Sequence, residues 1–280
     1  MTELPTGCPP GAALSVNAAG SRRAEGLQEY AADLHIHSVL SPCGDLEMSP
    51  SAIVRRAQQV SLSLIALTDH NRAENCPALH AAAAEVGLPV LYGLEVRTQE
   101  EVDVLCLFDR LAAALDWQEA LYPALPPVAN APLLFGDQVV VDQHERILKV
   151  EPKLLINAVA IPLQLVAQET VQRGGLVIAA HVDRPVNSLI SQLGFPPPGC
   201  PFDAAEVSPF GREEEVRSLH PSWQQIPLVR FSDAHQLDQI GKQRTVFRVS
   251  HPTVEELRLA LRGEGGRSFQ AIRGRPGSGP

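Results

Sequence analysis

The chain has 280 residues, of which 45% are hydrophobic and 20% are charged, and its formal net charge is −9. This composition is typical of a globular protein with one large domain or two small ones, and the negative charge argues against broad attraction to nucleic acid. The sequence has no run of about 18 uncharged apolar residues, so we expect no membrane span. Five cysteines without paired spacing, and a first segment without a signal pattern, indicate a reduced, cytoplasmic protein.

The two ends of the chain differ in composition from the rest. Residues 1–29 and 266–280 are rich in Gly, Pro, Ala or Arg and have no hydrophobic periodicity, so we expect them to be tails. A single domain is expected between them, over residues 30–265. Within it, the proline-interrupted segment 117–152 is interpreted as an insertion rather than as core.

Apolar strands and helices alternate along the predicted domain. Strands are predicted at 31–38, 63–68, 89–96, 101–108, 176–180, 202–207, 226–231 and 245–249. Helices are predicted to begin at Ser49-Pro50, near Glu74, at Ile161-Pro162 and at Thr253, and the second of them to end at Gly87. This alternation indicates a parallel sheet, and the number of repeats favours a closed or nearly closed barrel.

Imidazole and carboxylate side chains gather where the predicted strands end. They are His35, His37, Asp69, His70, Glu95, Asp103, His181, Asp233 and His235. Functional groups of a parallel barrel lie at the carboxyl ends of its strands, so we expect these side chains to converge. Mixed imidazole and carboxylate donors match zinc, manganese or iron better than calcium or a lone magnesium, and their number implies two or three divalent ions.

Five short motifs resemble those of a known family. Asp-Leu-His-Ile-His-Ser (33–38), Thr-Asp-His-Asn (68–71), Gly-Leu-Glu-Val (93–96), Ala-His-Val (180–182) and Ser-Asp-Ala-His (232–235) are similar to the successive motifs of the PHP (polymerase and histidinol phosphatase) superfamily. The resemblance runs from about residue 33 to residue 248. It implies an α/β fold, a distorted (β/α)7 barrel with up to three metal ions at its mouth.

The same resemblance implies how the ligands are shared. One metal would take His35, His37, Glu95 and Asp233; a second would share Glu95 and add His181 with a residue of the fourth strand; a third would take His70, His235 and a residue of the loop after His37. Asp69 would orient or supplement the third site. The fourth strand offers Asp103 where the family commonly has His, and the loop offers Cys43 or Asp45, of which we favour Cys43.

We expect this centre to hydrolyse phosphate esters in line, because a hydroxide that bridges two divalent metals is a nucleophile at neutral pH. The predicted substrate is a small phosphorylated metabolite or a nucleotide. Arg184 is the predicted phosphate clamp, and Arg212 and Arg97 are weaker candidates for substrate binding. Asp69, Asp183 and Arg184 form the predicted catalytic set, in which Asp183 orients Arg184 or transfers a proton.

Two other functions compete with this one. A nuclease that acts on oligonucleotide ends is less favoured, because the sequence has no basic stripe with interleaved aromatics and only 5% aromatic residues. A metal-binding module without catalysis, serving a larger assembly, is the third hypothesis, and Asp103 is the feature that leans toward it. Neither the substrate nor the oligomeric state follows from the sequence.

Overall fold

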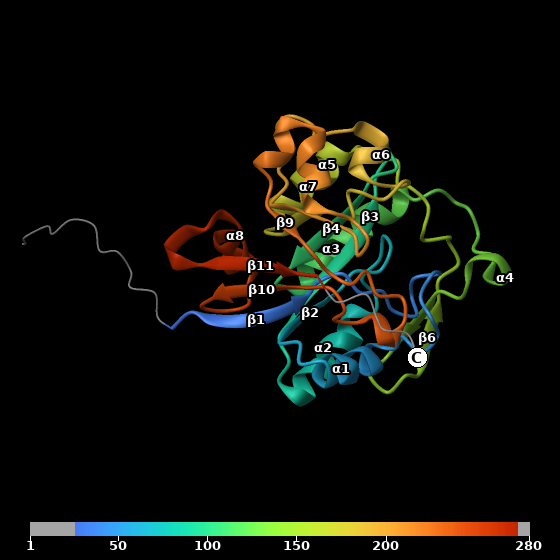
Figure 1. Cartoon of the computed structure of the whole chain (residues 1–280). Coiled ribbons are helices and arrows are strands. Elements are labelled where there is room, and N and C mark those ends of the chain that lie inside the picture. The colour runs from blue at the N-terminus through green and yellow to red at the C-terminus, as the bar shows by residue number, and fades with distance from the viewer. Residues whose placement is uncertain (1–25, 274–280) are drawn as a thin grey trace, which may run out of the picture.

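A curved sheet of nine strands organises the computed structural model, which describes residues 26–273 (Figure 1). The order of the strands is β11-β10-β1-β2-β3-β4-β7-β8-β9. Their bounds are β1 Gln28–Asp33, β2 Leu64–Leu67, β3 Val90–Arg97, β4 Asp103–Phe108, β7 Leu176–Ala179, β8 Ala204–Glu206, β9 Leu228–Val229, β10 Arg244–Val249 and β11 Ser268–Ile272. Beyond β9 the chain returns to the end of β1, where Ile36 and Ala234 form a parallel bridge. The strands from β1 to β9 therefore form a nearly closed barrel, which confirms the predicted fold class.

One barrel strand runs against its neighbours. β4 pairs antiparallel with both β3 and β7, so the prediction of a parallel sheet is wrong at this strand. The physical reason is the short connection of residues 98–102, because a parallel neighbour needs a crossover of a dozen or more residues. Asp103 is consequently the first residue of its strand, and it pairs in register with Arg97 at the end of β3.

The two ends of the described chain extend the sheet beyond the barrel. β10 pairs antiparallel with β1, and β11 pairs antiparallel with β10. Residues 268–272 are therefore a strand, which corrects the predicted tail at 266–280. The register places Phe269 opposite Phe247, a pair that the Gly- and Arg-rich surroundings concealed. Gln28 and Glu29 already belong to β1, and residues 1–25 of the other predicted tail lie outside the described residues.

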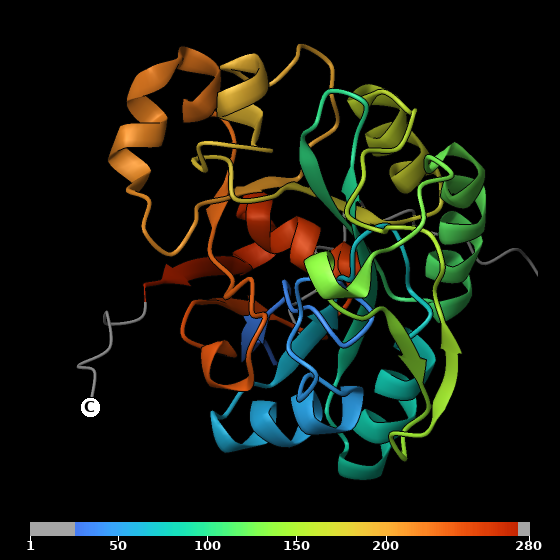
Figure 2. The same cartoon turned by 90° about the vertical axis from the view of Figure 1, so that its right-hand side faces the viewer.

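Helices surround the barrel on its outer side (Figure 2). They are α1 Pro50–Gln59, α2 Cys76–Val86, α3 Leu111–Leu121, α5 Leu163–Gln172, α6 Leu189–Leu193 and α7 Glu213–Leu219, with α4 Pro132–Phe135 and the hairpin of β5 Val139–Val141 and β6 Ile147–Val150 near the mouth. The helix ends follow the sequence signals: Ser49 caps α1 through a bond from the Ala52 amide, and Gly87 ends α2 with φ of 68°. No helix in the described range 26–273 is long and apolar enough to cross a membrane.

The interior of the barrel is apolar below the mouth. Buried Leu34, Leu64, Leu91, Leu105 and Ile178 form one cluster with Leu257 of α8 (Val254–Arg262), so α8 closes the far end. Residues two apart on a strand share a face, and Leu91 therefore shares a face with Gly93 and Glu95. A Cβ at Gly93 would lie 2.8 Å from Leu107 Cδ2, so glycine permits the close packing beneath Glu95.

The segment predicted to be an insertion is in part core. Trp117 and Leu121 lie in the second half of α3 and are 2% and 0% exposed. Val140 and Val141 of β5 are also buried. Prolines interrupt the sequence pattern only after α3 has ended, at the short turn Tyr122–Ala124. The interpretation of residues 117–152 as an insertion outside the core is therefore wrong for these four side chains.

Candidate metal centre

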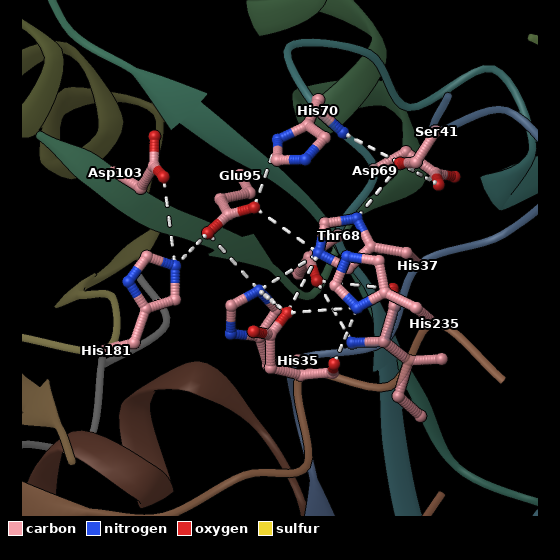
Figure 3. Close-up of polar contacts among 12 residues, drawn as sticks. His35, His37, Ser41, Thr68, Asp69, His70, Glu95, Asp103, His181 and His235 are labelled. Carbon is pink, nitrogen blue, oxygen red and sulfur yellow. Dashed lines mark hydrogen bonds and ion pairs between the residues drawn. The ribbon is translucent and has the colours of Figure 1, made fainter. Parts of the chain in front are cut away.

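Histidine and carboxylate side chains from the strand ends meet at one mouth of the barrel. Those of His35, His37, Asp69, His70, Glu95, Asp103, His181 and Asp233 are all at most 6% exposed. Glu95 lies at their centre, between His181 and Asp103 on one side and His70 on the other (Figure 3). His181 and Asp233 adopt positive φ angles of 26° and 49°, a strained backbone that clusters at functional sites.

A first group of donor atoms surrounds a single point. His35 Nε2 and His37 Nε2 are 3.2 Å apart, and Asp233 Oδ1 is 3.3 Å from each of them. Glu95 completes the group, with Oε1 3.4 Å from His35 Nε2 and Oε2 3.3 Å from His37 Nε2. Donors bonded tetrahedrally to a zinc-sized ion at about 2.05 Å would lie about 3.3 Å from one another. The spacing of these four residues therefore fits one divalent ion.

The hydrogen bonds of the two rings support this reading. His35 Nδ1 faces Glu206 Oε2 at 2.9 Å, and His37 Nδ1 faces Ser41 Oγ at 3.0 Å. When both rings are neutral, as metal ligands must be, and Nδ1–H donates to oxygen in each, both Nε2 atoms present lone pairs to each other at 3.2 Å. Two facing lone pairs repel, and a cation between them removes the repulsion.

A second group lies on the His70 side of Glu95. His70 and His235 gather with His37 and Cys43, each with a donor atom within 4.8 Å of the others. His70 Nδ1 is buried without a hydrogen-bond partner and is 3.1 Å from Glu95 Oε2, while His235 Nδ1 donates to the Asp233 carbonyl at 2.8 Å. The structure thus brings together the predicted third set.

The loop after His37 offers Cys43, and not Asp45, to this group. Cys43 is a free thiol in an exposed position, and the loop is tied to the site by a bond from the Asp45 amide to the His235 carbonyl. Asp45 uses its own carboxylate to accept from the Glu47 amide at 2.8 Å. The sulfur is therefore the donor that this loop directs toward His70 and His235.

A third group, on the other side, consists of His35, Glu95 and His181, whose donor atoms lie within 4.8 Å of one another. His181 Nε2 lies 2.9 Å from Glu95 Oε1 and 3.8 Å from Asp103 Oδ2. Both Asp103 oxygens accept from Arg97, at 2.8 and 3.0 Å, and Arg97 also donates to the Ile156 carbonyl. The predicted fourth-strand ligand is therefore already neutralised, and Arg97 binds Asp103 rather than facing a substrate.

Asp69 lies behind the donors and not among them. Its Oδ1 accepts from the Ser38 amide and the Ser41 hydroxyl, and its Oδ2 accepts from the Ser38 hydroxyl, all at 2.7 Å. Ser41 in turn accepts from His37 Nδ1. A role as ligand or catalytic group does not fit these bonds, whereas the predicted orienting role does.

The polar side chains predicted to bind substrate separate in the structure. Arg184 is 41% exposed and donates to Asp233, so it reaches the first donor group. Asp183 is held by the amide and hydroxyl of Ser208, at 2.7 and 2.6 Å, which does not fit a catalytic role. Arg212 is 67% exposed and pairs with Glu215 on the surface of α7, which does not fit contact with the site.

The first donor group, formed by His35, His37, Glu95 and Asp233, favours positive charge at its centre. Burial disfavours charged imidazoles, but Glu206, Asp233 and Glu95 nevertheless raise the pKa of His35 well above its usual value. Asp233 and Glu95 likewise outweigh burial and raise the pKa of His37 to about 9. Conversely, burial opposes ionisation of Asp233 while His35 and His37 lower its pKa. Protons are thus attracted where a metal ion would otherwise supply the positive charge.

Sequence reasoning missed Glu206 and Ser41. Glu206 is 1% exposed, and besides facing His35 it accepts from the His181 amide at 2.9 Å. The sequence contains a signal for Glu206, because this residue is at the carboxyl end of the apolar strand Ala204–Glu206. Ser41 carried no such signal, since a serine in a turn is common and its role depends on three-dimensional contacts.

Comparison with known families shows which family this chain belongs to. The family model described as the PHP domain matches residues 33–173, half of the chain. The chain belongs to the PHP family. A PolC-type DNA polymerase III of Listeria monocytogenes is 25% identical over 168 residues, which are 55% of this chain and 11% of the polymerase. A 5'-3' exoribonuclease of Haemophilus influenzae is 36% identical over 69 residues, which are 25% of this chain and 24% of that protein.

Solved structures show the same PHP fold. The lesion-specific endonuclease Q of Pyrococcus furiosus superposes with a TM-score of 0.64 at 20% identity, over 86% of this chain and 58% of that one. A structure described as a metal-dependent phosphoesterase, from Bifidobacterium adolescentis, superposes with a TM-score of 0.51 at 19% identity, over 73% and 87%. The PHP chain thus spans a minor part of the polymerase and rather more than half of the endonuclease.

Proposed function

We propose that this PHP protein is a metal-dependent phosphoesterase whose first ion is held by His35, His37, Glu95 and Asp233. The observation that carries the proposal is the pair of Nε2 atoms that face each other at 3.2 Å within a group of carboxylate oxygens. A second ion is held by His70, His235 and Cys43. Divalent ions at these positions would supply a nucleophilic water at neutral pH and neutralise phosphate oxygens.

The chain's own residues have separate roles in this proposal. Glu206 fixes the ring of His35, and Ser41 with Asp69 fixes the ring of His37, so that both Nε2 atoms point into the site. Arg184 binds a phosphate oxygen, because it is the exposed guanidinium that already reaches the donor group. Its bond to Asp233 would be exchanged for the substrate when the metal neutralises that carboxylate.

We propose two ions in each chain rather than three. On the side of His181, Arg97 binds both oxygens of Asp103, so a further ion would have only His35, Glu95 and His181 as ligands and would share two of them with the first ion. The guanidinium itself places a positive charge there, and a dication beside it would be repelled. Manganese, zinc and iron all suit the remaining donors.

The substrate class we favour is a nucleotide. Among the similar proteins, the polymerase, the exoribonuclease and the endonuclease are all named for nucleic acid, which supports this class over sugar phosphates. The net charge of −9 weighs against binding along an extended nucleic-acid backbone, so a single phosphate reached by Arg184 is preferred. A nuclease that removes terminal nucleotides is the second candidate on the same grounds.

The test combines metal analysis with hydrolysis. Protein purified without chelator should contain two ions per chain and should hydrolyse p-nitrophenyl phosphate, or bis(p-nitrophenyl) phosphate for a diesterase, in added manganese. His37→Ala should lose both, while His144→Ala, an exposed histidine outside the site, should retain both. Absence of bound metal together with absence of turnover on either ester would reject the phosphoesterase and favour a binding module.

A further inference from the structure

An aromatic side chain is held on an exposed loop that follows one of the barrel strands of the metal centre. The loop Ser208-Pro209-Phe210-Gly211 follows β8, and Phe210 is 91% exposed. A single exposed apolar residue is ordinary on a protein surface. What distinguishes Phe210 is the number of buried polar contacts that fix the loop carrying it.

Two buried or partly buried side chains fasten this loop. Arg230 is 3% exposed and donates to the carbonyls of Ser208 and Gly211, at 2.9 and 3.0 Å. From the other side Asp183 accepts from the amide and the hydroxyl of Ser208. A Cβ at Gly211 would lie 1.9 Å from Asp183 Oδ2, so the backbone packs directly on that carboxylate. Phe210 is therefore presented from a fixed backbone.

The fastened loop continues from a strand that carries a residue of the metal centre, and the loops after the carboxyl ends of barrel strands surround the mouth. It begins two residues after Glu206, which faces His35. Asp183 immediately precedes Arg184, which donates to Asp233. The same few residues thus connect Phe210 to the side chain that we propose binds phosphate.

We propose that Phe210 is the stacking surface for the nucleobase of a substrate whose phosphate is bound by Arg184 and the metal ions. This inference rests on the proposed function and adds the feature of the substrate that is recognised. A base gains affinity by stacking on an aromatic ring, and it loses little to ordering when the ring is carried by a fixed loop. Because every base has a π face, Phe210 recognises nucleotides without selecting one base.

The experiment measures binding, so that it does not depend on turnover. Calorimetric titration of the full-length, manganese-loaded protein compares adenosine 5'-monophosphate with ribose 5-phosphate, which differ by the base. We expect the nucleotide to bind about 5- to 100-fold more tightly. Phe210→Ala should abolish that ratio without changing the affinity for ribose 5-phosphate, and Phe210→Trp should restore it. Leu219→Ala, an exposed apolar residue at the other end of α7, should behave as wild type.

Three results would overturn the inference. They are equal affinities of the wild-type protein for the two ligands, an unchanged ratio in Phe210→Ala, and no binding of either ligand. Failure of the phosphoesterase proposal is distinguished from these, because it is read from hydrolysis of the p-nitrophenyl esters. A preference for the nucleotide that is lost in Phe210→Ala, in a protein without turnover, would support a nucleotide-binding site alone.

Discussion

The residues on the two sides of Glu95 are of similar type but have different partners. On one side the donor atoms of His70, His235 and Cys43 lie within 4.8 Å of one another. On the other side His181 meets Asp103, but the guanidinium of Arg97 is bound to both oxygens of that carboxylate. The difference teaches that strand-end residues of the same type can have different partners, because the carboxylate of Asp103 is bound by a cation of the protein itself.

The largest contrast should come from the two central carboxylates. Glu95→Gln removes the charge shared by both sides, so we expect loss of bound metal and at least an about 100-fold fall in the rate of ester hydrolysis. Asp103→Asn should retain two ions, because that carboxylate serves Arg97 and not a metal. Metal analysis and initial rates of both variants provide the check; equal metal loss in the two would remove the distinction between the sides.

Exchanging the ion pair should convert one side into the other. Replacing Arg97→Met together with Asp103→His removes the guanidinium and supplies an imidazole beside His181, so bound metal should rise from two ions to three. Asp103→His alone retains Arg97 and should remain at two. Elemental analysis of the purified proteins measures the number of ions. Three ions in the wild-type chain would show that Arg97 does not prevent a third ion from binding.

A smaller effect is expected from the residues that orient His37. Ser41→Ala breaks the chain of hydrogen bonds from Asp69 to His37 Nδ1 without removing a donor, and we expect about 10-fold weaker metal binding. Ser51→Ala is the matched control, because Ser51 of α1 donates to the Gln143 carbonyl and to none of the site residues. Competition with a chelating dye measures both affinities. Unchanged affinity in Ser41→Ala would mean that the ring needs no such support.

Metal removal should make stability depend on pH. The pKa of His37 is raised to about 9 in the fold from an ordinary 6.5. A raised imidazole pKa stabilises the folded state fully below pH 6.5, and that stabilisation is lost as pH rises through 9. Chelated protein should therefore have a Tm that falls by several degrees across this window, while the manganese-loaded protein should not. Parallel melting curves would test this, and identical slopes would contradict it.

Local signals predicted much of the fold because they are physical requirements of single elements. Ser49 caps α1 and Gly87 ends α2 as the sequence indicated, and the strand-end histidines converge as a barrel requires. The direction of β4 was missed because alternation of apolar runs does not report direction; the length of the 98–102 connection does. The strand β11 was missed because the residues that flank it are rich in Gly and Arg, while the strand itself is recognised from its pairing with β10 and from Phe269, which packs on the core.

The convergence of the strand-end side chains could be predicted, whereas their hydrogen-bond partners could not. His35, His37, Glu95 and Asp233 could be found because each follows or ends an apolar strand. The engagement of Asp69 by serines, and of Asp103 by Arg97, depends on side chains brought from separate turns and strands, and no spacing in the sequence encodes it. The sequence can predict which charged side chains converge, whereas the side chain that binds each carboxylate is decided by the packing of separate elements.

The reversed direction of β4 also determines where the chain can vary. Because β4 runs away from the mouth, α3 runs back toward it. Gln118, near the end of α3, accepts from the Ala73 amide beside the mouth. The connection that follows, residues 122–160, therefore emerges over the mouth, where the Val139 amide bonds to the Val39 carbonyl, before α5 descends again. Residues added to or removed from its exposed part, such as α4 with Leu133 and Leu134, would reshape the entrance without disturbing the buried Val140 and Val141 of β5. Variation of the entrance is thus expected in α4, for evolution and for a protein engineer alike.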